Sequence, residues 1–463
     1  MRVATVGVVA AVAAWVRLPL LFATLPAAYD NGVYAMSVAA MRSGARPFRD
    51  VFSSQGPTFL PILRGFDILG FERPWAPRLA MVAAGVAIAV GTVTVVRRVR
   101  STEASIALGL AAATSSAVVI ASGPLESDGI ALAFGIAAVA TALSDRQGRA
   151  VPIAVGVLAA LSIATKSLLI APAAAVAFWL VWRRRSSGDA GISTIAGVIT
   201  GLIVTVPFGF AEVWDQFVTF HIAIPQEIAP LQNIGRLASD LVRRDGVALG
   251  LGVVAVAWWI IQRRRGAEGG RIPADLTSAA WIWLLGSLGV LILTSDLSSG
   301  NVRYIAFVVI PAIILAGASR LPDRVVVAVV VVLLPIQLLA NMSSLEGRAP
   351  NVDERRVVAA MESLRPGASV VGDDQSLMFL AGVSTPAWLT DTSYARIRAG
   401  YLLPDDVAVA VADGDTCAVL IWSGRFDELD PDLAAKATRH GYTDRTDFGD
   451  GRVLLARPGC RAG

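Results

Sequence analysis

The chain has 463 residues, of which 55% are hydrophobic and 16% are charged. A soluble domain is typically roughly 45–50% apolar and about 25% charged, so this composition excludes an ordinary soluble protein. The formal net charge of +4 is small, and the basic residues lie in short clusters between apolar stretches, which indicates membrane topology signals and argues against a nucleic-acid partner.

Long apolar stretches predict about eleven transmembrane helices, because a helix needs about 20 mostly apolar residues to cross a bilayer. The first stretch has an alternative interpretation as a cleaved signal peptide, since small residues near Ala27 follow it. Arg17 inside the stretch and the motif directly after it favour an uncleaved helix. The predicted spans are 3–22, 77–96, 104–121, 129–143, 150–165, 167–182, 191–210, 246–262, 278–295, 302–319 and 324–341.

Basic clusters set the orientation of these spans, because short cytoplasmic loops are rich in Lys and Arg. Every cluster follows an even-numbered span, so all of them lie on one side of the membrane. This predicts a multi-pass protein of a bacterial plasma (inner) membrane, with a cytoplasmic N-terminus and an extracytoplasmic C-terminal domain. The clusters are Arg97-Arg98-Val99-Arg100, Arg146 with Arg149, Arg183-Arg184-Arg185, Arg263-Arg264-Arg265, and Arg320 with Arg324.

The first outer loop, 23–76, is predicted to hold two short helices. The Asp30 carboxylate can cap a helix that runs to about Met41, which Gly44 terminates. A Gly-Pro turn at 56–57 precedes a second apolar stretch over 58–70. Because both segments are short, we expect interfacial helices that lie at the membrane surface.

The chain divides into a transmembrane domain, 1–345, and a C-terminal domain, 346–463, in which charged residues become frequent. Helix and strand patterns alternate in the second part, which predicts a small α/β domain of roughly 110 residues with its own core. We expect helices over 352–364 and 431–440, a short helix from 378, and strands over 368–372, 417–422 and 452–456.

Two features of the C-terminal domain bear on its role. Asp373 and Asp374 follow a predicted strand, where ligands tend to bind in α/β folds. Because the sequence has no glycine-rich phosphate loop, we expect a scaffold that covers the membrane site or contacts an acceptor. Cys417 and Cys460 can pair in an oxidising compartment, but the sequence alone cannot establish that they approach each other.

Six short motifs follow one another along residues 10–320: Asp30-Asn31-Gly32-Val33-Tyr34, Gly44 with Pro47-Phe48-Arg49-Asp50, Gln55-Gly56-Pro57, Ser127-Asp128-Gly129, Ala164-Thr165-Lys166 and Arg303-Tyr304. In this order and spacing they resemble the motifs of the GT-C membrane glycosyltransferases, and most closely those of the branch of protein O-mannosyltransferases and the lipid A aminoarabinose transferase. The sequence departs from the family pattern by having Gly56 where many relatives have Pro, and a single acidic residue at 30 in place of a pair.

The resemblance implies a hexosyl- or pentosyltransferase that moves a sugar from a polyprenyl-phosphate donor, held among membrane lipids, to a cell-envelope glycan, lipid or protein. An acceptor hydroxyl has a high pKa, so its attack needs a carboxylate base, and a direct displacement inverts the anomeric centre. We expect Asp30 to be this base, with helix capping as the alternative role. The leaving lipid phosphate needs cationic contacts more than a proton.

Lys166 and Arg303 are the candidates for holding the phosphate, because ionisable residues near membrane segments are costly and usually functional. Their alternative role is snorkelling to lipid headgroups, which we expect for Arg17. Tyr304 accompanies Arg303. Asp128 and Glu126 lie at the start of the fourth span, where their alternative to a substrate or metal role is a favourable interaction with the helix dipole.

Three more residues of the outer loops complete the predicted substrate-binding set. Asp50 is the second carboxylate of the first loop, and its alternative role is a turn or an ion pair beside Arg49. Gln55 belongs to the turn that resembles the family motif. His221 lies in the 211–245 loop among aromatic residues, and a lone histidine is more often a structural hydrogen-bonding group.

The resemblance requires no cofactor. Some GT-C relatives hold a divalent cation with outer-loop acids, but users of polyprenyl monophosphates generally do not require one. Two other functions remain open from the sequence, a multi-span transporter or lipid flippase and a non-catalytic envelope scaffold. An inverted repeat is not evident and charges inside the spans are sparse, which argues against transport.

Overall fold

The computed structural model describes residues 3–22, 29–225, 229–264, 274–294, 302–345 and 350–461. The chain folds as two compact units. The helical unit comprises Met1–Leu21, Arg78–Val204 and Gln226–Glu346. The mixed unit comprises Phe22–Pro77, Thr205–Pro225 and Gly347–Gly463, so it contains the first outer loop together with the predicted C-terminal domain.

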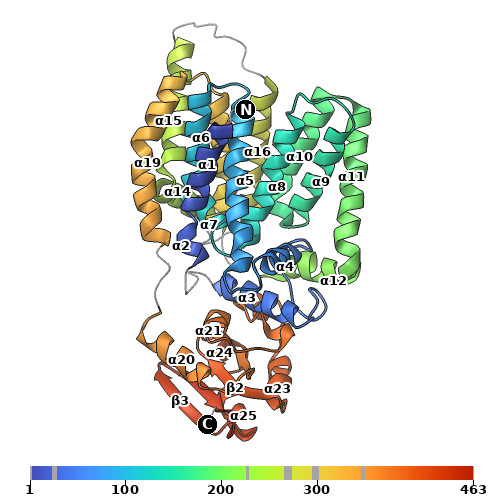
Figure 1. Cartoon of the computed structure of the whole chain (residues 1–463), viewed down its shortest axis with the longest axis vertical. Helices are drawn as coiled ribbons and strands as arrows, with labels where there is room; N and C mark the ends of the chain where they lie inside the picture. The colour runs from blue at the N-terminus through green and yellow to red at the C-terminus, as the bar shows by residue number, and fades with distance from the viewer. Residues whose placement is uncertain are drawn as a thin grey trace. The chain divides into compact units, whose positions relative to one another are not determined.

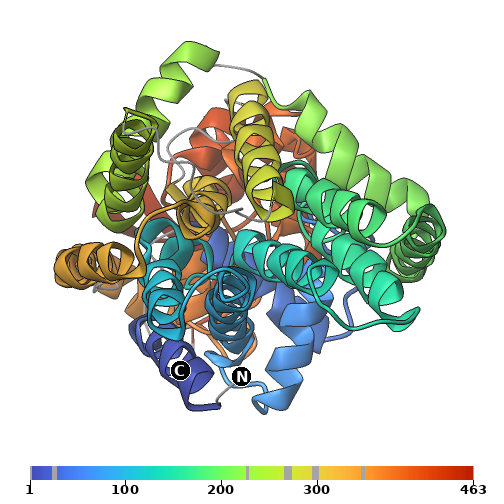
Figure 2. The same cartoon turned by 90° about the horizontal axis from the view of Figure 1, so that it is seen from above.

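Helices of the helical unit cover each of the predicted apolar spans, and Figures 1 and 2 show them running side by side. Within the described residues, four helices are long and apolar enough to cross a membrane: Ala76–Val96, Ser187–Phe208, Asp275–Leu293 and Asp323–Asn341. The helices are α1 (Val3–Trp15), α2 (Leu18–Leu21), α5 (Leu79–Val96), α6 (Thr102–Thr114), α7 (Ser116–Ala121), α8 (Ser127–Ala142), α9 (Ala150–Ile163), α10 (Ser167–Arg184), α11 (Ser187–Thr205), α14 (Pro230–Arg244), α15 (Gly246–Arg264), α16 (Ala274–Leu293), α18 (Ala306–Ala318) and α19 (Asp323–Leu345).

The helical unit carries apolar side chains on its surface as well as in its core. Its core is built from small and branched side chains with a few large ones, such as Trp283 and Phe307. On α11, Ile195, Ile199 and Ile203 recur every fourth residue and are all more than half exposed. A helix that turns large apolar side chains outward suits a lipid environment and not water.

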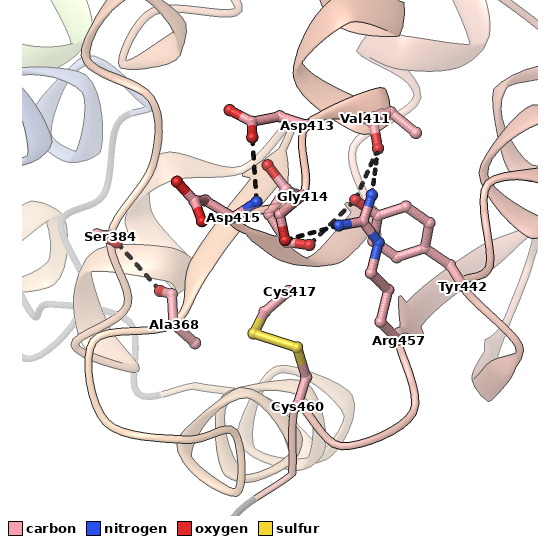
Figure 3. Close-up of a disulfide and its surroundings, with 11 residues drawn as sticks. Ala368, Ser384, Val411, Asp413, Gly414, Asp415, Cys417, Tyr442, Arg457 and Cys460 are labelled. Atoms are coloured by element: carbon pink, nitrogen blue, oxygen red, sulfur yellow. Dashed lines mark hydrogen bonds between the residues drawn. A yellow bond between two sulfur atoms is a disulfide. The ribbon is translucent and has the colours of Figure 1, made fainter.

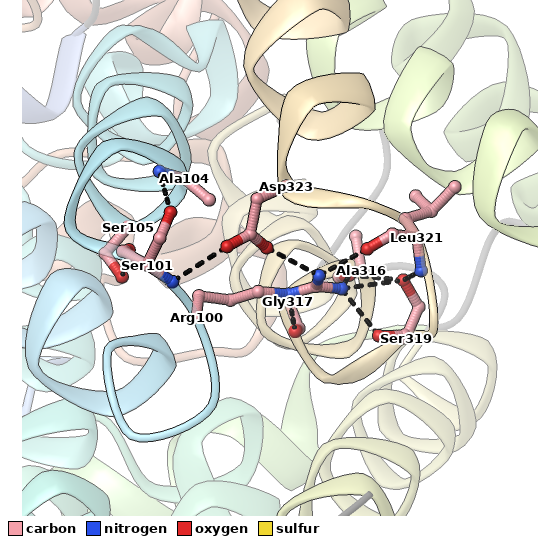
Figure 4. A network of polar contacts seen from close by, with 9 residues as sticks. All are labelled: Arg100, Ser101, Ala104, Ser105, Ala316, Gly317, Ser319, Leu321 and Asp323. Atoms are coloured by element: carbon pink, nitrogen blue, oxygen red, sulfur yellow. Dashed lines mark hydrogen bonds and ion pairs between the residues drawn. The ribbon is translucent and has the colours of Figure 1, made fainter. Parts of the chain in front are cut away.

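A network of hydrogen bonds around Arg100 joins two loops of the helical unit on the predicted cytoplasmic side (Figure 4). Arg100 precedes α6 and donates hydrogen bonds to the backbone oxygens of Gly317 and Ser319, at the end of α18. It also pairs with Asp323, the first residue of α19, at 2.8 Å, and Asp323 accepts a bond from the Ser101 N–H at 2.9 Å. This arginine thus satisfies carbonyls that the end of α18 leaves unpaired.

The first outer loop forms the two expected helices, α3 (Tyr29–Arg42) and α4 (Phe59–Leu69). Residues 31–38 of α3 are all buried, and the helix packs against α21 (Gln375–Leu380) of the C-terminal part. The helix α3 is therefore a core element of the mixed unit, whereas its sequence led us to expect a helix that lies on the membrane surface. Four short helical turns follow α11: η2 (Val206–Phe208), α12 (Phe210–Trp214), η3 (Asp215–Thr219) and α13 (Phe220–Ala223).

The C-terminal part is built on a four-stranded sheet in the order β1-β2-β4-β3, with β1 and β2 parallel and the other pairs antiparallel. The strands are β1 (Ser369–Gly372), β2 (Thr416–Ile421), β3 (Asp444–Gly449) and β4 (Arg452–Ala456). Alternate residues of the strands face two apolar clusters, one with α20 (Val352–Glu362) and α21, the other with α23 (Pro404–Ala412), α24 (Arg425–Leu429) and α25 (Leu433–Arg439). The α/β character is thus as expected, with a mixed sheet.

The strand β3 was not predicted, because its sequence is rich in charged residues. It lies at the edge of the sheet, and its residues alternate between partly buried and exposed. Charged side chains are common on edge strands, where they discourage pairing with a second chain.

Cys417 and Cys460 form a disulfide, with 5.5 Å between their Cα atoms (Figure 3). The bond ties β2 to the end of the chain after β4. Nearby, Arg457 donates hydrogen bonds to the backbone oxygens of Gly414 and Val411, at 2.9 and 3.0 Å. The pairing that the sequence left open is therefore present in the structure.

Candidate functional site

Four ionisable side chains meet inside the helical unit, and we call them the charge cluster. Glu126 directly precedes α8, and Asp128 is in the first turn of that helix. Lys166 directly precedes α10. Arg303 lies in the short turn η4 (Val302–Ile305), which leads into α18. Loop ends that are far apart in the sequence thus bring two carboxylates and two cations together.

Arg303 is at the centre of the charge cluster. Its guanidinium pairs with the Glu126 carboxylate, and its Nε lies 3.5 Å from Oδ2 of Asp128. The other Asp128 oxygen, Oδ1, lies 3.7 Å from Nζ of Lys166. The ring of Tyr304 contacts both cations, at 5.1 Å from the guanidinium carbon of Arg303 and 5.3 Å from Nζ of Lys166.

Burial makes the charge cluster costly to maintain. The carboxylate side chains of Asp128 and Glu126 are 0% and 3% exposed, and the side chains of Arg303 and Lys166 are 9% and 12% exposed. The two positive and two negative charges balance, but moving paired ions out of water still costs several kcal/mol per ion, which apolar packing would avoid. Ionisable groups retained in such a place usually serve a function.

The Asp128 carboxylate has unused capacity for hydrogen bonds. It is fully buried, and neither of its oxygens accepts a hydrogen bond from any group in the described parts of the chain. Its two ion-pair distances, 3.5 and 3.7 Å, are longer than direct charge-assisted hydrogen bonds. A ligand with hydroxyl groups would therefore find an acceptor at this position.

Two local features fix the position of the start of α8 against the segment that precedes it. A side chain at Gly129 would put its Cβ 2.5 Å from the carbonyl oxygen of Ala121, so only glycine permits this approach. Arg17 is fully buried and donates hydrogen bonds to Ser122 Oγ at 2.8 and 2.9 Å, just ahead of Glu126. The expectation that Arg17 snorkels to lipid headgroups is wrong, because carbonyl and hydroxyl oxygens inside the bundle satisfy its guanidinium.

Asp30, the predicted base, lies in the mixed unit as the second residue of α3, where it is half-buried. A second carboxylate, Asp391, lies near it. Burial raises the pKa of Asp391, the Arg396 guanidinium opposes that change, and the negative charge of Asp30 adds to it. Asp30 is thus placed in an environment that the C-terminal part of the chain helps to build.

No protein-family model matches the sequence, and no curated protein sequence matches it. Solved structures do match. ArnT from Cupriavidus metallidurans in the apo state is 18% identical, covers 100% of this chain and 98% of its own, and superposes with a TM-score of 0.67. The same protein bound to undecaprenyl phosphate is 16% identical, with both chains covered at 100% and a TM-score of 0.69.

A third solved structure is more distant. The archaeal oligosaccharyltransferase AglB from Archaeoglobus fulgidus, in complex with an inhibitory peptide and a dolichol-phosphate, is 12% identical. The match covers 94% of this chain and 70% of that protein, with a TM-score of 0.53. ArnT and AglB are both GT-C membrane glycosyltransferases.

This chain has the GT-C fold.

With this fold and four helices suited to crossing a membrane, the chain is a multi-pass membrane protein.

In this GT-C fold, four of the predicted binding residues come together, namely Asp128, Lys166, Arg303 and Tyr304. The other predicted residues lie in the mixed unit and make local contacts. The Asp50 side chain is 41% exposed, accepts a hydrogen bond from the Arg46 N–H at 2.8 Å and lies 3.7 Å from the Arg46 guanidinium.

Gln55 and His221 are enclosed by their neighbours. The Gln55 side chain is buried and donates a hydrogen bond to Ser54 Oγ at 3.2 Å. His221 contacts the backbone oxygen of Phe217 through Nδ1 at 3.0 Å and packs edge-on against Phe220. These contacts are typical of structural roles, so substrate binding by these two residues stays a prediction.

Asp391 and Thr392 belong to these sites but were not predicted, whereas Glu126 was considered beside Asp128 without being included in the substrate-binding set. Glu126 is the nearest carboxylate to Arg303, and its position beside the Ser127-Asp128-Gly129 motif was the available signal. Asp391 and Thr392 belong to the C-terminal part of the chain and lie close to Asp30 and Tyr29, the first residues of α3. Thr392 is 363 positions from Tyr29, its contact in that helix, and no sequence pattern connects the two.

Proposed function

We propose that this chain is an inverting glycosyltransferase that moves a sugar from a polyprenyl-phosphate donor to a cell-envelope acceptor on the outer face of a bacterial plasma membrane. The observation that carries this proposal is the charge cluster, in which a buried arginine and a buried lysine lie on either side of Asp128. The solved structures of the same fold that hold undecaprenyl phosphate and dolichol-phosphate support this class of donor.

The phosphate of the donor would bind to Arg303 and Lys166. Arginine can hold two phosphate oxygens at once, and lysine adds a compact charge. Because Glu126 and Asp128 already neutralise these cations, an arriving phosphate has to replace at least one carboxylate. Glu126 is the group we expect to be displaced, since its acid group pairs with the same guanidinium.

The chemistry is a single displacement at the anomeric carbon. The acceptor oxygen forms a bond to that carbon while the bond from the carbon to the phosphate oxygen breaks, and the electron pair leaves with the phosphate. Asp30 takes the proton of the acceptor hydroxyl. Arg303 and Lys166 stabilise the negative charge that grows on the leaving phosphate, which is the largest electrostatic demand of the reaction.

No metal step is part of the proposal. The two cations of the charge cluster already balance its two carboxylates. In the parts of the chain that the structure describes, three or more His, Cys, Asp or Glu side chains do not gather as a ligand set for a metal ion.

The proposed topology has eleven spans, with the N-terminus in the cytoplasm and the sheet of the C-terminal part outside. The helices over the predicted spans and the alternation of the arginine clusters support it. The disulfide between Cys417 and Cys460 also supports an extracytoplasmic location for the sheet, because such bonds persist in oxidising compartments.

The test is transfer by the purified protein in lipid nanodiscs, supplied with a panel of radiolabelled polyprenyl-phosphate sugars and envelope extract. We expect label from at least one donor to enter an acceptor, with release of polyprenyl phosphate in equal amount. Movement of intact donor across a vesicle membrane without transfer would favour a flippase. The absence of both transfer and movement would favour a scaffold.

A further inference from the structure

Tyr29 is the first residue of α3 and directly precedes Asp30, and the C-terminal part of the chain holds it on two sides. Its hydroxyl lies 3.0 Å from Thr392 Oγ1 and accepts a hydrogen bond from the Thr392 N–H at 2.9 Å. Its ring lies against the guanidinium of Arg425, with 3.6 Å between the guanidinium carbon and the ring centroid. Both the polar tip and the face of the ring are therefore held.

The hydrogen bonds around Thr392 have a defined direction. The Thr392 hydroxyl donates its only proton to Oε1 of Gln375 at 3.1 Å. The Tyr29 hydroxyl must therefore donate its own proton to Thr392 Oγ1 while it accepts from the Thr392 N–H. Burial, the largest cause, raises the pKa of Tyr29 well above its usual value, and the charge of Asp391 adds to it, so the hydroxyl keeps the proton that it donates.

The two residues that contact Tyr29 are both connected to the end of β1, Thr392 through Gln375 and Arg425 directly. Gln375 donates hydrogen bonds to the backbone oxygens of Gly372 and Leu389, each at 3.1 Å. Arg425 donates to the backbone oxygen of Asp373 at 3.0 Å. The contacts of Tyr29 with Thr392 and Arg425 are thus tied to the end of β1.

The rest of α3 is held along the same face. A Cβ at Gly32 would lie 2.3 Å from the backbone nitrogen of Ser376, so the helix touches α21 closely there. Further along, Ser37 Oγ lies 3.3 Å from Thr390 Oγ1. Because successive helical residues are turned by about 100°, Asp30 lies on the flank of this face. Asp30 is therefore carried by a helix whose first turn and buried face are fixed by these contacts.

We propose that Thr392 and Arg425 are positioning residues for Asp30, which act on it through Tyr29. This inference rests on the proposed function, in which Asp30 is the catalytic base. A reacting group displaced by about 1 Å can cost roughly 100-fold in rate, so a loose first turn of α3 lowers turnover without changing how the donor binds. The C-terminal part of the chain then takes part in catalysis by positioning the base.

The experiment measures turnover, the KM for the donor, donor affinity and melting temperature for Tyr29→Phe, Thr392→Val and Arg425→Gln. We expect kcat to fall about tenfold or more in each variant, while the KM and the donor affinity stay within about twofold. Thr392→Ser retains the hydroxyl and is expected to restore most of the turnover. Thr438→Val, at an exposed threonine of α25, is the matched control and keeps wild-type turnover.

The possible results separate this inference from the proposed function. Unchanged kcat in Tyr29→Phe and Thr392→Val, with turnover lost in Asp30→Asn, overturns the positioning role and leaves the function intact. If Asp30→Asn keeps full turnover, the assigned base is wrong and the proposed function has to be revised. If Thr392→Val does not fold, Tyr29→Phe decides the question, because it removes a single oxygen; wild-type kcat in that variant overturns the inference.

Discussion

The guanidinium of Arg303 forms an ion pair with the carboxylate of Glu126 inside the helical unit. Both side chains are less than one-tenth exposed, so water contributes little to either charge. If Arg303 binds the donor phosphate, Glu126 and the phosphate compete for the same guanidinium, and this competition can be measured.

Glu126→Gln is expected to strengthen binding of undecaprenyl phosphate about tenfold, which corresponds to about 1.4 kcal/mol, because it removes the competing charge. The lipid-free variant should melt at a lower temperature than the wild type, since the buried Arg303 loses one of its two carboxylate partners. Native mass spectrometry with added lipid measures the affinity. Asp145→Asn, which removes an exposed partner of Arg98, is the control. Equal or weaker lipid binding in Glu126→Gln would show that the carboxylate does not compete.

Arg303→Gln and Lys166→Gln are expected to weaken binding of undecaprenyl phosphate by roughly 10- to 100-fold, because hydrogen bonds to charged groups contribute about 1.5–3 kcal/mol. Arg303→Lys should recover little of the loss, since lysine cannot hold two oxygens of one phosphate in a fixed plane. Arg98→Gln is the matched control, because Arg98 is an arginine of the same unit that pairs with Asp145. Wild-type affinity in both cluster variants would place the phosphate elsewhere.

Asp30→Asn is expected to lower kcat by about 10²–10⁴-fold, because the amide cannot take the proton of the acceptor hydroxyl. Donor binding and melting temperature should stay close to those of the wild type, because asparagine also serves at a helix start. Rates with saturating donor, together with donor binding measured separately, distinguish these effects. A variant that retains turnover would show that Asp30 is not the base.

Asp374 makes the stability of the mixed unit depend on pH. Burial raises the pKa of its carboxyl from 3.8 to about 6, and the charge of Asp373 adds to the effect. The folded chain therefore binds this proton more tightly than the unfolded chain, and the stabilisation present below pH 3.8 is lost as the pH rises through about 6. The difference in melting temperature between the wild type and Asp374→Asn should grow between pH 4 and 6.

Asn at this position keeps the acceptor that caps α21, where Asp374 binds the Leu377 N–H at 3.1 Å. Any pH-dependent difference then comes from the lost titration and not from the cap. We expect Asp374→Asn to be the more stable protein at pH 7. Melting curves that shift in parallel over this range would contradict the raised pKa.

Much of the fold could be predicted because its signals are local. Apolar length marked the helices of the bundle except α14, which lies in the predicted 211–245 loop, and Asp30, Gly44 and the turn at Gly56-Pro57 marked the two helices of the first loop. The burial of α3 was not predictable in this way. Its close approach to α21 depends on Gly32 and Ser376, whose contact joins distant parts of the chain.

In the candidate site, too, the sequence identified individual residues but not the contacts between distant ones. Lys166 and Arg303 could be selected from the sequence, because an ionisable residue at the end of an apolar span is unusual. Their pairing with Asp128 and Glu126 depends on how helix ends meet, which no local pattern encodes. Arg17 shows the opposite error, since a lone arginine in an apolar stretch suggested lipid contact, but backbone oxygens of the bundle bind it.

The central claim is that the phosphate of a polyprenyl-phosphate carrier binds at the charge cluster. The most direct measurement is an experimental structure of the protein in nanodiscs with undecaprenyl phosphate, determined by electron cryomicroscopy. We predict phosphate density within hydrogen-bonding distance of Arg303 and Lys166, with the Glu126 carboxylate moved away from the guanidinium. Lipid phosphate bound at another place, with the pair between Arg303 and Glu126 intact, would contradict the account.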